Sequence, residues 1–200
     1  IASAGGRVVL ARADVRDESQ VSDMVEGVSR QLGPIDTLVS NASIGFPVKP
    51  FTEYTWTEFE RKLTGELKAT FLCCKAVLPS MIARRAGCII AISSGLSRQP
   101  GEGFCAHSTA KSGLDAFVRS LALELGPVGV RVNAVGPGLT RTDATAFMTE
   151  PQKQAMAAMT PLRRVGEPED IAGVVLMVAS DHSRFLSGVY VPASGGALMV

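Results

Sequence analysis

The chain has 200 residues and a mass of 21.0 kDa, the size of one domain. Apolar residues make up 46% of it and charged residues 20%, which excludes intrinsic disorder. Twenty lysines and arginines against nineteen aspartates and glutamates give a net charge of +1. This balance offers no basic excess for nucleic acid or for an anionic membrane, so neither is an expected partner.

Four cysteines, Cys73, Cys74, Cys88 and Cys105, show no metal-ligand spacing, and the sequence has only two histidines. We therefore expect no metal site, and we interpret the cysteines as buried free thiols in a reducing compartment. The longest apolar run, 171–179, is too short to span a bilayer. The expectation is a cytoplasmic chain that forms a single domain over residues 1–200.

Apolar periodicity and breaker residues predict alternating strands and helices along the chain. Asp17 is expected to cap the first long helix, and Gly33-Pro34 to end it. Gly65 and Pro79 are expected to weaken the second. The predicted strands are 8–14, 35–40, 87–93, 130–135 and 188–191. The predicted helices are 18–32, 54–85, 104–125, 142–159 and 168–180.

Strands separated by long helices are typical of a parallel sheet with helices on both faces. The fold class is therefore α/β. Ligands of such sheets bind at the carboxyl ends of the strands. The loops expected to form a site are 14–15, 41–45, 93–103 and 136–142.

One group of residues has the chemistry of an acid–base site. Ser94 follows the predicted strand 87–93, and His107 and Lys111 are four apart on the helix that comes next, so they share a helix face. A hydroxyl could orient a substrate oxygen, an imidazole could move a proton, and an ammonium could tune both. Alternatively, Ser94 is a cap, His107 a polar helix residue and Lys111 a solvated one.

The sequence resembles the short-chain dehydrogenase/reductase family over essentially its whole length. The matching stretches are 13–15, 41–43, 90–94, 108–113, 120–138, 166–171 and 187–196. The resemblance implies a Rossmann-like, doubly wound parallel sheet. It also implies an oxidoreductase that transfers a hydride between NAD or NADP and a small carbonyl or alcohol substrate, and that forms a homodimer or homotetramer.

The family's functional residues carry over position by position. Ser94 matches the catalytic serine that hydrogen-bonds the substrate oxygen, and Lys111 the lysine that binds the nicotinamide ribose. The other implied cofactor contacts are Asp14 and Val15 at the adenine, Asn41 and Ala42 at the ribose, and Pro137, Gly138 and Thr142 over the nicotinamide amide and the phosphates. Each of these residues also has an alternative role without a ligand. Asp14 could be an acid at the start of a helix, Asn41 could form a turn, and Pro137-Gly138 could simply interrupt regular structure in a loop.

The first departure from the family concerns the Gly-rich phosphate turn, which is absent from this sequence. The family's first two strands and helices are absent with it, so the expected fold is N-terminally truncated. The predicted strand 8–14 then has no neighbour to pair with. We expect the sequence to be a fragment of a longer gene, and the isolated chain to be aggregation-prone and to bind no dinucleotide tightly.

Three further departures fall at site positions. His107 stands where the family has its proton-donating tyrosine, Glu66 where it usually has an asparagine, and Ser43 where a glycine is common. Glu66 could pair with Lys111 or His107 and raise the pKa of the imidazole. The alternative is that Glu66 is a solvated helix residue in a shifted register.

Three functions remain open from the sequence. The first is a nicotinamide-dependent reductase or dehydrogenase in which His107 replaces tyrosine as the acid–base group. The second is a non-redox lyase or dehydratase that uses Glu66, His107 and Lys111. The third is an inactive subunit. If His107 is the acid–base group, activity is expected to follow a titration near neutral pH. The substrate and the choice between NAD and NADP stay open.

Overall fold

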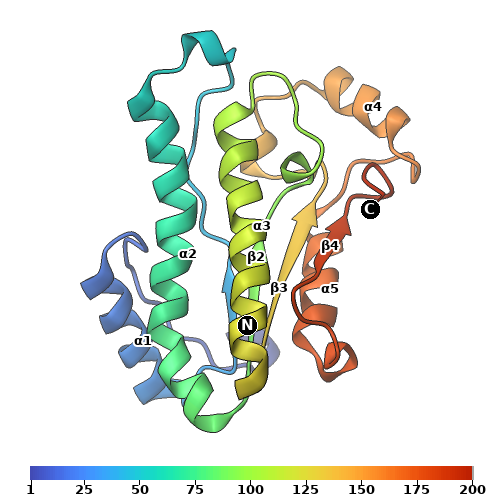
Figure 1. The fold of residues 1–200 in the computed structure, drawn as a ribbon. Helices are drawn as coiled ribbons and strands as arrows, with labels where there is room; N and C mark the ends of the chain where they lie inside the picture. Colours follow the sequence, from blue (N-terminus) through green and yellow to red (C-terminus); the bar gives the residue numbers. More distant parts are fainter. Residues whose placement is uncertain (200) are drawn as a thin grey trace.

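The computed structural model describes residues 1–199, which form one four-stranded parallel sheet and five α-helices (Figure 1). The strands are β1 (Thr37–Ser40), β2 (Gly87–Ile92), β3 (Val130–Pro137) and β4 (Tyr190–Ala193), in that order across the sheet. The helices are α1 (Glu18–Leu32), α2 (Trp56–Arg84), α3 (Cys105–Leu125), α4 (Glu150–Met159) and α5 (Pro168–Ala179). Within residues 1–199, no helix combines the length and apolar character that crossing a bilayer requires.

Side chains of β2 alternate between two apolar layers, one on each face of the sheet. Ile89 and Ala91 pack with residues of α2 and α3, whereas Cys88 and Ile90 pack with residues of α5. Figure 1 shows α3 crossing β2 and β3 on one side, with α5 on the other. Helices therefore cover both faces, and the carboxyl ends of the parallel strands share one edge of the sheet.

Local signals place the helix ends close to the prediction. Asp17 caps α1, its side chain accepting a hydrogen bond from the Gln20 backbone N–H at 3.1 Å, and Gly33 ends this helix with φ at 97°. Helix α2 runs unbroken through Gly65 and Pro79, contrary to the weakening predicted there. A Cβ at position 65 would collide with the Ile44 side chain, so glycine lets the loop after β1 lie directly on α2.

The predicted buried strand 8–14 is wrong. These residues form no strand, Leu10 is 94% exposed, and Val8 is 45% exposed. A strand is stabilised by backbone hydrogen bonds to a neighbour, and within residues 1–199 the sheet ends at β1, so this apolar stretch has no ladder partner.

The predicted helix 142–159 is also only partly right. Residues Asp143–Thr145 form a short 3-10 helix, and α4 begins at Glu150 behind a capping box of Thr149 and Gln152. The capping box is a local signal for a helix start that periodicity alone does not reveal. The last predicted strand lies two residues later than expected, at Tyr190–Ala193.

Candidate active site

The candidate site lies where β1 and β2 end, and one carboxylate is at its centre. Glu66 of α2 has a side chain only 2% exposed. Its Oε1 accepts hydrogen bonds from Lys62 Nζ at 2.5 Å and from the Ser43 hydroxyl. Its Oε2 accepts from Lys111 Nζ at 2.6 Å. Glu66 is therefore not the solvated helix residue of the alternative interpretation, and it pairs with Lys111.

Lys111 approaches this carboxylate from α3. It is buried, and its Nζ also donates to the carbonyl oxygen of Ile92, the last residue of β2, at 2.8 Å. An ammonium removed from water needs an anionic partner, because burying it unpaired costs several kcal/mol. Glu66 is that partner. Within residues 1–199, two of the three ammonium N–H groups have acceptors, which leaves one for a ligand.

Lys62 is a second buried lysine of the site, and the sequence interpretation missed it. It lies one helical turn before Glu66 and is 1% exposed. Its Nζ donates to the Ile44 carbonyl at 2.9 Å and to Ser43 Oγ at 3.1 Å. With Glu66 as the third acceptor, all its N–H groups are used. The spacing of Lys62 and Glu66 beside the small residues Gly65 and Ala69 was a signal that could have revealed a buried pair.

His107 contributes an aromatic ring that is stacked and that makes no hydrogen bond to the described residues. The ring lies 4.7 Å from that of Phe46 between centroids, at an interplanar angle of 18°. Phe104 approaches it edge-on at 6.5 Å. The buried Nδ1 has no hydrogen-bond partner within residues 1–199. A buried ring nitrogen without a partner is costly, and it is free to meet a substrate oxygen.

The surroundings of His107 oppose its protonation. Burial, followed by the positive charges of Lys62 and Lys111, lowers the pKa of His107 from 6.5 to about 4. Glu66 acts in the opposite direction but is outweighed. Glu66 therefore acts on this pKa in the predicted direction, but burial and the two lysines outweigh it, so the pKa of His107 lies below the near-neutral value expected. The expected pH dependence of activity stays a prediction. At pH 7 the imidazole is uncharged.

Glu66 itself stays ionised. Burial acts to raise the pKa of Glu66, but Lys111, Lys62 and Ser43 outweigh it and hold that pKa below its ordinary value. Burial lowers the pKa of Lys62. An ionised carboxylate whose two oxygens are both hydrogen-bonded is a poor proton carrier. Glu66 therefore compensates charge, and the two lysines leave the cluster with one net positive charge.

Ser94 lies at the end of β2, outside this cluster. Its Oγ accepts a hydrogen bond from the Leu96 backbone N–H at 3.2 Å, which caps the 3-10 helix Gly95–Ser97. Its carbonyl accepts from the Tyr190 hydroxyl at 3.0 Å, and glycine at position 136 leaves the space for that tyrosine. Among the described residues, no hydrogen bond joins Ser94 Oγ to His107 or Lys111. The hydroxyl hydrogen of Ser94 remains available to a ligand.

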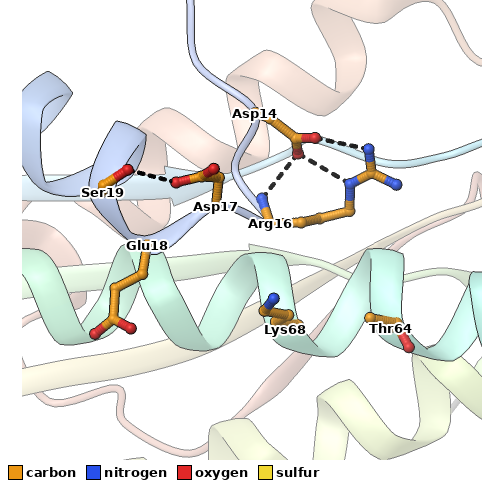
Figure 2. A pocket seen from close by; sticks show the side chains of 7 residues that line it. All are labelled: Asp14, Arg16, Asp17, Glu18, Ser19, Thr64 and Lys68. Atoms are coloured by element: carbon orange, nitrogen blue, oxygen red, sulfur yellow. Dashed lines mark hydrogen bonds and ion pairs between the residues drawn. The ribbon is translucent and has the colours of Figure 1, made fainter.

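One of the two predicted adenine contacts, Asp14, lines a surface hollow of about 540 Å³ between the start of α1 and α2 (Figure 2). Asp14 accepts hydrogen bonds from Arg16 Nε at 2.9 Å and Nη2 at 2.7 Å. These bonds from Arg16 lower the pKa of Asp14 to about 2. Val15 is half-buried against the apolar contact of α1 with α2. The helix cap is Asp17, so Asp14 is not the capping acid.

The other predicted cofactor residues also follow strand ends. Asn41 and Ala42 are exposed directly after β1. Pro137 ends β3, and the Gly138 N–H donates to the Ala193 carbonyl at 3.0 Å. Thr142 is exposed at the start of the 3-10 helix Asp143–Thr145. All five therefore lie along the edge of the sheet at which Lys111 meets Ile92.

These positions fit one half of a nicotinamide dinucleotide. Lys111, with one free N–H, and the exposed polar residues Asn41 and Thr142 suit the hydroxyls and amide of the nicotinamide riboside. For a pyrophosphate, residues 1–199 contain no Gly-rich turn between a strand and a helix. The described part of the chain also holds no group of three or more metal-ligating side chains.

Comparison with known proteins identifies the family of the chain. Residues 1–197 match the family described as enoyl-(acyl carrier protein) reductase. The chain is 36% identical to a 3alpha-hydroxysteroid dehydrogenase of Mediterraneibacter gnavus, over 92% of this chain and 73% of the relative. It is 33% identical to a cis-4-hydroxycyclohexanecarboxylate dehydrogenase of Sinomonas cyclohexanicum, over 96% and 78%. It is 37% identical to a 3-oxoacyl-(acyl-carrier-protein) reductase of Aquifex aeolicus, over 90% and 72%. The chain belongs to the short-chain dehydrogenase/reductase family.

Proposed function

We propose that this protein is an oxidoreductase that transfers a hydride between NAD or NADP and a carbonyl or alcohol substrate. Its sheet would be part of a doubly wound Rossmann-type fold. The observation that carries the proposal is the Lys111 ammonium, held by Glu66 and the Ile92 carbonyl next to the unpaired ring nitrogen of His107. A charged donor and a free imidazole at the carboxyl ends of parallel strands suit a reacting oxygen.

In this proposal His107 acts as an uncharged imidazole. A neutral imidazole donates a hydrogen bond readily but a proton poorly, so His107 orients and polarises the substrate oxygen. The net positive charge of the Lys62–Glu66–Lys111 cluster stabilises the negative charge that develops on that oxygen, which then takes a proton from water. Ser94 can add a second hydrogen bond from its hydroxyl. A bound nicotinamide dinucleotide would supply or accept the hydride.

The substrate class follows from the surroundings of His107 and from the relatives. Phe46 and Phe104 lie against the imidazole and offer apolar contact. The relatives are named for a hydroxysteroid, a hydroxycyclohexanecarboxylate and a 3-oxoacyl group. We propose a secondary alcohol or ketone on an apolar ring or acyl chain. We also propose a homodimer or homotetramer built through α2 and α3, which expose Phe71 and Leu123.

The site speaks against a lyase that uses Glu66 as its base. Both Glu66 oxygens are occupied by lysine ammonium groups, and the pKa of the carboxyl is held low. Removing a proton from carbon would need a free and more basic group. The redox reaction needs no such role from Glu66.

The test is consumption of reduced nicotinamide by the full-length protein with cyclic ketones and 3-oxoacyl thioesters. Lys111→Met should lower kcat/KM by about 10²–10³-fold, because the loss of one hydrogen-bond donor that stabilises charge in the transition state usually has an effect of this size. Arg30→Met, at an exposed position of α1 outside the site and the proposed interface, also removes one positive charge and is the control, which should keep the wild-type rate. A folded Lys111→Met protein with the wild-type rate would overturn the assignment. Loss of water from a hydroxyacyl substrate, without use of nicotinamide, would favour the lyase, and no turnover at all the inactive subunit.

A further inference from the structure

We infer that Lys62 is a positioning residue of this site. With Glu66 and Ser43 it fastens loop 43–46 to α2, and the loop holds Phe46 against the ring of His107. The inference rests on the role proposed above for His107, but it concerns how that ring is held. It assigns Lys62 a purpose beyond its share of the positive charge of the cluster.

Lys62 joins the loop to the helix through hydrogen bonds that leave none of its donors free. Two acceptors, Ser43 Oγ at 3.1 Å and the Ile44 carbonyl at 2.9 Å, belong to the loop. The third, Glu66 Oε1 at 2.5 Å, belongs to α2. The Ser43 hydroxyl donates to the same Glu66 oxygen. Because its three N–H groups are used, Lys62 cannot donate to a substrate without releasing the loop.

The loop 43–46 places Phe46 in the candidate active site. The Lys62 ammonium lies 4.7 Å from the centroid of the Phe46 ring, a cation–π distance. The His107 ring stacks on the same phenyl ring with its centroid also 4.7 Å away. Residues 41–50 contain no helix or strand, so contacts of this kind help to determine where Phe46 lies, beside the hydrogen bond from the Lys49 N–H to the Gly103 carbonyl. The Phe46 ring thus lies in contact with both the Lys62 ammonium and the His107 ring.

Lys62 also acts on His107 through its charge. The charged groups that face His107 are Lys62 and Glu66 from α2 and Lys111 from α3, while Phe46 and Phe104 are uncharged neighbours. After burial, the charge of Lys62 is the largest cause of the lowered pKa of His107. The pKa of His107 therefore reports whether the Lys62 charge is held beside the ring, and the ring signals report whether Phe46 is held against it.

The experiment is a pH titration of the His107 ring signals by NMR in the full-length protein, for wild type and three variants. Lys62→Met should raise the pKa of His107 by about one unit or more, because a nearby positive charge is lost. Lys62→Arg should retain most of the wild-type behaviour. Lys49→Met is the matched control. Lys49 follows the loop 43–46 in the chain and forms an ion pair with Glu58 of α2 at 2.8 Å. Lys49 does not face His107, so this variant should leave the pKa of His107 unchanged.

Ser43→Gly keeps the inference falsifiable if Lys62→Met does not fold. It removes loop hydrogen bonds without changing any charge, and it should shift the His107 ring signals as Phe46 loosens, while the pKa moves little. Turnover should fall in parallel in Lys62→Met, and its pH profile should gain a titration between about pH 5 and 6. Wild-type His107 signals in Ser43→Gly, or a wild-type pKa in folded Lys62→Met, would overturn the inference. Because NMR needs no turnover, a wild-type protein without nicotinamide activity would defeat only the proposed function.

Discussion

Two ion pairs beside α2 have almost the same length but different surroundings. Glu66 and Lys111 are 2.6 Å apart with side chains 2% and 6% exposed. Asp14 and Arg16 are 2.7 Å apart with side chains 42% and 43% exposed. Water can replace a lost partner only at the exposed pair, whereas at the buried pair the remaining charge would stay without solvation. Burial, and not the distance between the charges, therefore decides how much each pair matters.

The largest effect is expected from Glu66→Gln. This change leaves the ammonium groups of Lys62 and Lys111 buried together without an anion, and should reduce the free energy of unfolding by about 3–5 kcal/mol. Urea denaturation followed by circular dichroism measures it. A loss below about 1 kcal/mol would mean that the two lysines find water or another partner.

A smaller effect, with a defined pH dependence, is expected at His107. With a pKa of about 4 when folded and 6.5 as its ordinary value, His107 binds more protons in the unfolded chain between these limits. The free energy of unfolding should therefore decrease as the pH falls from about 6.5 to 4. The total loss due to His107 should be roughly 3 kcal/mol. His107→Phe keeps an aromatic ring against Phe46 and should remove this part of the acid destabilisation.

Urea unfolding of the wild type and of His107→Phe at pH 7, 5.5 and 4.5 tests this sign. As the pH falls, the free energy of unfolding of the variant should rise steadily relative to that of the wild type. Parallel curves would show that the imidazole is already charged in the folded protein, or that it is not buried in solution. Either result would return His107 to the proton-donor role expected from the sequence.

The smallest effect on stability is expected from Asp14→Asn at the exposed pair. The melting temperature should change by no more than about 2 °C, because water solvates Arg16 when the carboxylate is lost. Fluorescence titration of the full-length protein with reduced nicotinamide dinucleotide should nonetheless show weaker binding, if Asp14 contacts the adenine. A large loss of stability would contradict the comparison of the two pairs, and unchanged affinity would contradict the assigned contact.

Much of the fold could be predicted because its signals are local. The Asp17 cap, the Gly33-Pro34 end and the apolar run before Ser93 predict α1 and β2 to within one residue at most boundaries. The stretch 8–14 carries the same kind of apolar signal and forms no strand. A strand also depends on a neighbour, and apolar composition does not report whether one is present.

The sequence by itself determined the alternation of strands and helices, the loops that meet at one sheet edge, and the unusual residues Ser43, Glu66 and His107. Only the tertiary structure decided that Glu66 holds two lysines and that His107 is uncharged. Glu66 and Lys111 are 45 positions apart, and the pKa of His107 depends on burial and on charges from two different helices. Capping and periodicity act over a few neighbouring residues, but desolvation and charge act through space, so packing alone sets them.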